Sequence, residues 1–181
     1  MRGAYYEQKI NTYSLTTMGL LIAMIIILTN YLSVETQFLR VSFEFIPQAI
    51  LGMLFGPFWA GISSVVADII GTTLFGKAGF FIGFTLNAFI AGVLYGLFFY
   101  KKEITFKNTF ICVLLNTIII SLFLTPLWLS IMYKVPFFNI GLWIPRIIKS
   151  VAMLFIQTGS IMFFGKSLPL KTLTSRYMVK K

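Results

Sequence analysis

The chain has no histidine, one cysteine and five acidic residues, and each shortage excludes a class of chemistry. Without histidine, and with Cys112 alone inside an apolar stretch, neither a zinc site nor a cysteine–histidine nucleophile can be assembled. A disulfide within the chain is excluded too. The acids are too scattered for the close pair that holds Mg²⁺ against a phosphate: Glu7, Glu35, Glu44, Asp68 and Glu103. We therefore expect no metal site, no cofactor and no catalytic residue.

Apolar residues are abundant, at 58% of the chain with a mean hydropathy of +0.90, far above a soluble domain. A straight helix needs roughly 20 residues to cross about 30 Å of hydrocarbon. The sequence therefore predicts spanning helices over 14–34, 43–55, 58–75, 80–100, 108–132 and 142–165. We interpret the short second segment as a tilted or partly buried crossing instead of a re-entrant loop. The predicted fold is an all-α integral membrane protein, a six-helix bundle in which residues 1–181 form one domain.

The basic residues predict the topology. Six crossings place both termini on one side, together with most of the positive charge: Arg2, Lys9, Lys101, Lys102, Lys107, Lys166, Lys171, Arg176, Lys180 and Lys181. The opposite loops carry Arg40, Lys77 and Lys134. By the positive-inside rule both termini are cytoplasmic. Since the charges are spread over three cytoplasmic segments instead of one basic face, we expect no nucleic-acid partner.

Polar side chains inside the predicted helices fall at one depth. At about 1.5 Å of rise per residue, they form a layer roughly 7 to 12 Å below the outer surface: Gln48, Asp68, Asn87, Thr125, Trp128, Arg146 and Lys149. Arg146 and Lys149 are spaced i, i+3 and share a helix face. One acid cannot neutralise two bases at this depth, so an anionic ligand is expected. The alternative is that Asp68 pairs with one of them in a buried network that fixes helix register.

Trp128 follows Pro126, where a helix kinks and backbone carbonyls are freed. A planar heteroaromatic ring could stack there, with Asp68 or Asn87 bonding to the donors of the ring. Simple packing of Trp128 is the alternative.

Two loops would close such a site from outside. The first, around 33–42, carries Glu35 and Arg40, and the second contains Gly76, Lys77 and Gly79, with glycine hinges suited to a lid. If 40–44 is helical, Arg40 and Glu44 are spaced i, i+4, so their mutual pairing competes with ligand contact.

Small residues recur at four-residue spacing, which lets helices approach closely. We expect Gly92 and Gly96, in the series that begins at Ala88, to pack inside the bundle, whereas Gly19 and Ala23 could face a partner protein.

Taken together, these residues resemble the substrate-binding S components of energy-coupling factor (ECF) vitamin transporters, most closely their folate-specific branch. The similarity runs from Leu15 to about Gly165, and its strongest parts are Leu39-Arg40-Val41-Ser42-Phe43 through Ile46-Pro47, Gly52-Met53-Leu54-Phe55-Gly56-Pro57, Ala67-Asp68-Ile69-Ile70-Gly71 and Gly83-Phe84-Thr85-Leu86. The resemblance implies a multi-pass protein of the bacterial cell membrane that captures a vitamin from outside and delivers it by toppling. It also implies a transmembrane coupling subunit and two cytoplasmic ATPases as partners, which use the ATP.

The resemblance implies roles for individual residues. Gly19 and Ala23 match the family's docking motif for the coupling subunit, with glycine in place of the first alanine. Folate would supply carboxylates for the cations and a pterin ring for Trp128. The expected substrate-binding residues are Arg40, Gln48, Asp68, Asn87, Trp128, Arg146 and Lys149. Two alternatives stay open: an S component for another vitamin, and a small integral membrane enzyme acting on lipids.

Overall fold

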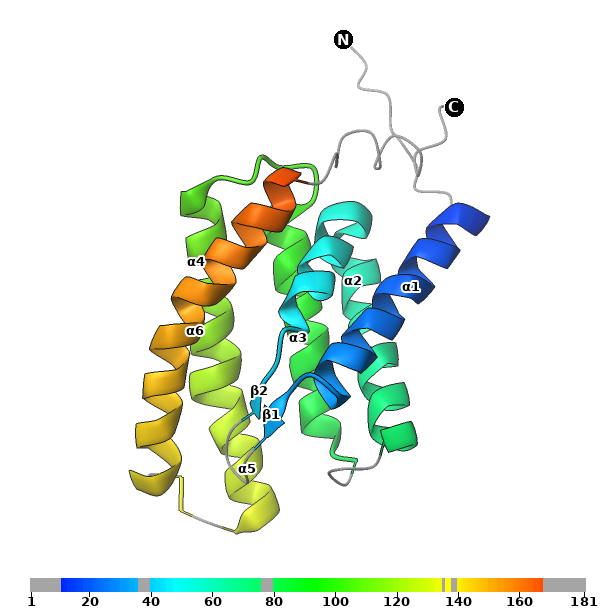
Figure 1. The fold of residues 1–181 in the computed structure, drawn as a ribbon. Coiled ribbons are helices and arrows are strands. Elements are labelled where there is room, and N and C mark those ends of the chain that lie inside the picture. Colours follow the sequence, from blue (N-terminus) through cyan, green and yellow to red (C-terminus); the bar gives the residue numbers. More distant parts are fainter. Residues whose placement is uncertain (1–10, 36–39, 76–79, 135, 138–139, 168–181) are drawn as a thin grey trace.

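The computed structural model describes residues 11–35, 40–75, 80–134, 136–137 and 140–167. Its described elements are helices and one short ribbon. The helices are α1 (Thr12–Asn30), α2 (Phe45–Phe75), α3 (Ile82–Phe99), α4 (Phe106–Asn116), the π-helix η1 (Thr117–Leu124), α5 (Thr125–Tyr133) and α6 (Ile140–Ser167). Strands β1 (Val34–Glu35) and β2 (Arg40–Val41) pair antiparallel. Figure 1 shows that α1 begins and α6 ends at the same end of the bundle, while the ribbon lies toward the other, which we call the ribbon end.

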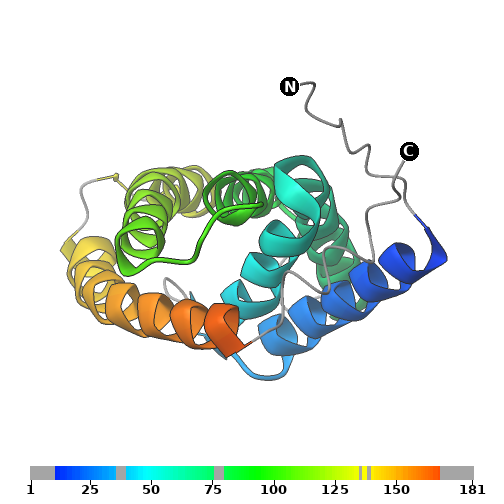
Figure 2. The same cartoon turned by 90° about the horizontal axis from the view of Figure 1, so that it is seen from above.

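The helical membrane fold is confirmed. Within the described residues, 5 helices can cross a membrane by length and composition, and α4, η1 and α5 form one of them as a continuous rod, Phe106–Tyr133. Seen from above, this rod and α6 lie at one side of α3, and α1 and α2 lie at the other (Figure 2). The largest shift from a predicted boundary is in α1, which ends at Asn30 instead of residue 34 because the chain then enters the ribbon.

The predicted helices 43–55 and 58–75 both lie within α2, on either side of Gly56. Gly56 is not helical, with φ 80° and ψ −178°, a region that only glycine adopts readily. Pro57 follows, and its missing N–H suits the first turn of a new helix. In Figure 1 the cyan arm of α2 before Gly56 rises from the ribbon, and the blue-green arm after it descends again. The break predicted at Gly56-Pro57 is therefore a reversal of the chain.

The interface between α2 and α3 depends on glycines. A Cβ atom added to Gly96 would lie 2.3 Å from Cα of Pro57, and one added to Gly92 would lie 2.5 Å from the carbonyl oxygen of Ala60. The prediction that Gly92 and Gly96 pack inside the bundle is thus confirmed. Gly19 differs, because nothing lies within 4 Å of a Cβ added there.

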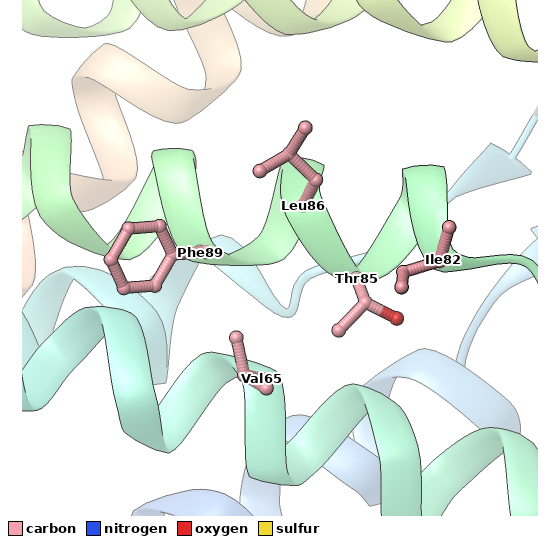
Figure 3. A pocket seen from close by; sticks show the side chains of 5 residues that line it. All are labelled: Val65, Ile82, Thr85, Leu86 and Phe89. Atoms are coloured by element: carbon pink, nitrogen blue, oxygen red, sulfur yellow. The ribbon is translucent and has the colours of Figure 1, made fainter.

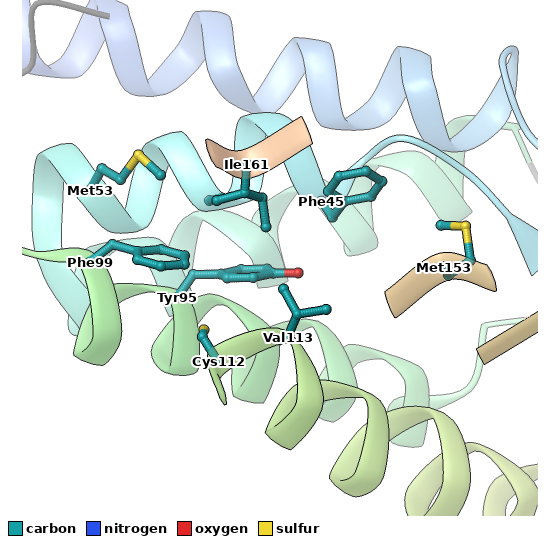
Figure 4. Close-up of a cluster of buried hydrophobic side chains, with 9 residues drawn as sticks. Phe45, Met53, Tyr95, Phe99, Cys112, Val113, Met153 and Ile161 are labelled. Carbon is teal, nitrogen blue, oxygen red and sulfur yellow. The ribbon is translucent and has the colours of Figure 1, made fainter. Parts of the chain in front are cut away.

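Two apolar clusters hold the bundle together. One packs α1 against both arms of α2 and is formed by Met18, Leu21, Ile25, Leu51, Leu54, Phe55, Ala60 and Ala67. The other surrounds Tyr95 and joins α2, α3, α4 and α6 (Figure 4): Phe45, Ala49, Met53, Tyr95, Phe99, Cys112, Val113, Met153 and Ile161. Cys112 is fully buried there, as expected for a core residue. Many large apolar side chains remain exposed on the outer helix faces, as suits a protein surrounded by lipid.

Candidate functional site at the ribbon end

Gln48 joins three helical segments through its side-chain amide. Its Nε2 donates to Oγ of Ser64 at 2.9 Å and to the carbonyl oxygen of Ala88 at 3.2 Å. Gln48 is 8% exposed and Ser64 is buried. Both donors of the amide are therefore used between the two arms of α2 and α3. Ser64 was not predicted, because one serine in an apolar helix gives no signal of its own.

Asp68, on the second arm of α2, accepts a hydrogen bond from Thr85 of α3. The Thr85 Oγ1 to Asp68 Oδ2 distance is 2.7 Å, and Asp68 is half-buried. Thr85 was also missed as a functional candidate, although it lies in one of the segments that carried the family resemblance. The hydroxyl orients one carboxylate oxygen.

Asn87 and Trp128 are in contact, as their common predicted depth suggested. The indole Nε1 of Trp128 donates to Oδ1 of Asn87 at 3.1 Å, and Nδ2 of Asn87 donates to Oγ1 of Thr125 at 3.2 Å. Asn87 is 7% exposed, whereas Trp128 remains partly exposed. Both ends of the Asn87 amide are thus bonded to protein, and Trp128 presents the accessible surface.

The π-helix explains the position of Arg146. In η1 the N–H of Thr125 bonds to the carbonyl of Ile120, five residues earlier. The next donor in this register would be residue 126, which is proline and has no N–H. The carbonyl of Ser121 is consequently free to accept from Nη1 of Arg146, at 3.0 Å. Arg146 is 3% exposed, so Pro126 and the π-helix together supply a partner for a buried cation.

Three further hydrogen bonds connect α6, the ribbon, α1 and the segment before α2 at the ribbon end. Lys149 Nζ donates to the carbonyl oxygen of Arg40. Nη2 of Arg40 donates to the carbonyl oxygen of Thr29 at 3.0 Å, and the hydroxyl of Thr29 donates to Oε2 of Glu44. Arg40 lies in β2 and α2 begins at Phe45, so the helical spacing that would pair Arg40 with Glu44 is not formed.

The charges of the ribbon end form one electrostatic neighbourhood. Arg40 and Glu44 interact electrostatically with both Asp68 and Lys149, and Arg146 interacts with Lys149. Of the described residues, three basic side chains therefore interact here with two acidic ones, and a third acid, Glu35, lies opposite Arg40 in the ribbon. The buried Arg146 and the partly buried Lys149 are thus the groups suited to hold an anion.

Only part of the two predicted closing loops falls within the described residues. Gly76, Lys77 and Gly79 lie outside the described residues. Glu35 lies in β1, opposite Arg40 in the register of the ribbon.

An apolar groove of about 230 Å³ lies on the outer face of α2 and α3 and shares Thr85 with the candidate site (Figure 3). Its lining is Val65, Ile82, Thr85, Leu86 and Phe89. Ile82 is 73% exposed and Leu86 is 44% exposed, so the groove opens to the surroundings of the bundle. None of these five described lining residues carries a charge that could hold an anion.

A helical membrane bundle with cations and acids toward one end, and a partly exposed tryptophan bonded to a buried asparagine, has the architecture of a substrate-binding membrane protein. The family model described as "ECF transporter, substrate-specific component" matches residues 13–172. The chain therefore belongs to the substrate-specific components of ECF transporters, which confirms the resemblance seen in the sequence. Because this is a family of transport proteins, the prediction that the chain is not an enzyme is confirmed as well.

Individual relatives are consistent with this membership. The folate transporter FolT of Clostridium novyi is 40% identical over 115 residues, which are 64% of this chain and 67% of the relative. FolT of Leuconostoc mesenteroides is 31% identical over 156 residues, 83% of each chain. A crystal structure of FolT bound with folic acid matches with a TM-score of 0.85 and 49% identity, over 89% of this chain and 96% of that one.

Proposed function

We propose that this chain is the folate-binding S component of an ECF-type transporter. The observation that carries the proposal is that one rod, η1–α5, holds both a buried cation and the tryptophan: Ser121 accepts from Arg146, and Trp128, two turns later, bonds to Asn87. Lys149 interacts with Arg146, and Asp68 is bonded to Thr85 on the same helix as Asn87. Folate is a dianion with a flat, donor-bearing pterin ring, so it needs cations, a stacking surface and an acceptor. The names of the FolT relatives and the folic acid bound in the FolT crystal structure support the same ligand.

The contacts suggest how the ligand would be held. Lys149 and Arg146 would anchor the glutamyl carboxylates, with Arg40 at the rim. The ring would stack on Trp128 and donate to the carboxylate of Asp68, whose second oxygen is held by Thr85. Gln48 and Asn87 would act chiefly by fixing the walls of the site, since their amides bond to protein.

Folate binding is the measurement that tests this function. Purified chain in detergent or nanodiscs should bind folate saturably, one molecule per chain, by isothermal titration. A competition panel of other vitamins against bound folate separates this proposal from an S component for another nutrient. The proposal fails if another vitamin binds more tightly than folate, or if the chain instead turns over a lipid substrate.

We further propose six crossings, with each arm of α2 counted as one and both termini in the cytoplasm. The support is the chain reversal at Gly56 and the shared end of the start of α1 and the end of α6. In a Cys112→Ser background, a membrane-impermeant maleimide should label Lys134→Cys on intact cells. It should label Lys101→Cys only after permeabilisation. Labelling in the reverse order would refute this orientation.

Gly19 and Ala23 are proposed to dock on the transmembrane coupling subunit, which works with two ATPases that supply the energy. Both residues are exposed, and the space over Gly19 is open. The chain should therefore copurify with a coexpressed coupling module. A Gly19→Leu chain that still copurified would show that docking uses another face.

A further inference from the structure

The indole of Trp128 lies directly against the backbone of α3 at Gly83. A Cβ added to Gly83 would lie 2.5 Å from Cδ2 of Trp128 and 2.8 Å from Cε2. These two atoms form the bond shared by the two indole rings, so the centre of the bicycle covers the glycine. The same Cβ would lie 2.5 Å from Cε1 of Phe81. Since no real Cβ is found at such distances, any side chain at position 83 must displace at least one ring.

Two more contacts fix the indole within its plane. The ring of Phe81 lies beside that of Trp128, with centroids 5.9 Å apart and planes inclined by 59°. Asn87, one helical turn after Gly83, accepts the indole N–H at 3.1 Å. The contacts therefore hold the ring against α3 and beside Phe81 and fix its N–H edge, while the residue as a whole stays partly exposed.

The orientation of the Asn87 amide is determined by its partners. An indole N–H can only donate, so the amide atom that faces it is the oxygen. The Thr125 hydroxyl donates to the carbonyl of Ile120 at 2.7 Å, so its oxygen is free to accept from the Asn87 nitrogen. The indole is thus tied through Asn87 and Thr125 to the backbone of the π-helix.

We infer that Gly83 and Asn87 are positioning residues that hold the Trp128 indole as a preformed stacking plate for the flat ring of the ligand. The inference rests on the proposed function for the identity of that ring. A plate that is already ordered saves the cost of immobilising a large side chain on binding. Neither residue needs to touch the ligand, which is why the amide of Asn87 is bonded to protein at both ends.

The test compares Gly83→Ala with Gly159→Ala. Nothing lies within 4 Å of a Cβ added to Gly159, so the control makes the same change in a helix without displacing a ring. Folate and p-aminobenzoylglutamate are titrated against each variant. The second ligand keeps the carboxylates of folate but lacks the pterin.

Gly83→Ala should weaken folate binding by up to about ten-fold, the equivalent of a strong aromatic stack, and Gly159→Ala should not. Binding of p-aminobenzoylglutamate should change by less than about three-fold in both, because it has no pterin ring to stack on the indole. Equal losses for both ligands, or no loss for folate, would overturn the inference. Absence of folate binding by the unmutated chain would instead refute the proposed function.

The plate itself can be tested without ligand. With Trp59→Phe and Trp143→Phe, the emission of the chain comes from Trp128 alone, since the sequence has 3 tryptophans. Gly83→Ala should shift this emission and increase its quenching by acrylamide. Should Gly83→Ala not fold, Thr125→Val provides the readout, because it removes the acceptor of Asn87 while the Trp128 residue itself is kept. Its emission should change as expected for Gly83→Ala, and Thr125→Ser should restore the original emission. Unchanged emission and quenching in Thr125→Val would contradict the positioning role.

Discussion

Replacing Arg146 and Lys149 together by alanine is expected to abolish measurable folate binding. A hydrogen bond to a charged group contributes about 1.5 to 3 kcal/mol, so two of them correspond to roughly a 10²- to 10⁴-fold loss of affinity. The loss is steep because Arg146 is buried and Lys149 is partly buried, so water replaces the missing cations poorly. Isothermal titration of the double variant against the unmutated chain measures it.

The matched control removes the same two charges elsewhere. Lys102 and Lys107 are exposed, near the turn between α3 and α4 at the opposite end of the bundle, and Lys102→Ala with Lys107→Ala should leave folate binding unchanged. Arg146 also bonds to the carbonyl of Ser121, so its loss changes packing as well as charge.

Pteroic acid, which lacks the glutamate, separates these two effects. The Arg146 and Lys149 double variant should lose far less affinity for pteroic acid than for folate. If the double variant bound folate as tightly as the unmutated chain does, the anion site would be misplaced even with folate as the correct ligand.

Gly96→Ala is expected to cause the largest loss of stability among the glycine variants. The new methyl group would lie 2.3 Å from both Cα and N of Pro57, which are backbone atoms at the reversal of α2 and cannot rotate away. Forcing the helices apart costs about 3 kcal/mol, the upper end of the usual cost of overpacking, because the contact is with backbone. The measurement is the midpoint of thermal unfolding in detergent, followed by size-exclusion chromatography with intrinsic fluorescence.

Gly159→Ala is again the control, because its Cβ points into open space and alanine favours a helix over glycine. Its midpoint should equal or exceed that of the unmutated chain. Equal midpoints for Gly96→Ala and Gly159→Ala would show that α2 and α3 do not pack as closely as the structure has them.

Much of the fold could be predicted from the sequence because lipid imposes a simple rule. Apolar runs of sufficient length must be helical to satisfy their backbone, and the runs at 80–100, 108–132 and 142–165 correspond closely to α3, the α4–η1–α5 rod and α6. The break at Gly56-Pro57 was also predictable from the sequence, because glycine adopts non-helical backbone angles readily and proline lacks the N–H that a helix needs. The π-helix was not, because nothing in Thr117–Leu124 distinguishes it from an ordinary apolar helix.

The candidate site was predictable where charge in lipid demands an explanation, as for Asp68, Arg146 and Lys149. Its partners were not predictable, because Thr29, Thr85 and Ser121 are common residues whose role depends on which helix lies opposite. For Asn87, too, the sequence could not predict the hydrogen-bond partners. Its place in the polar layer was predicted from its depth, yet only the arrangement of α3 against α5 shows that its amide is bonded to Trp128 and Thr125.

A structure of this chain with folate bound tests the central claim most directly. The account predicts the pterin ring stacked on the exposed part of Trp128, with a glutamyl carboxylate within hydrogen-bonding distance of Lys149 or Arg146. Folate density in the groove lined by Val65, Ile82 and Leu86, or at the ribbon end without contact to Trp128 and either cation, would contradict it.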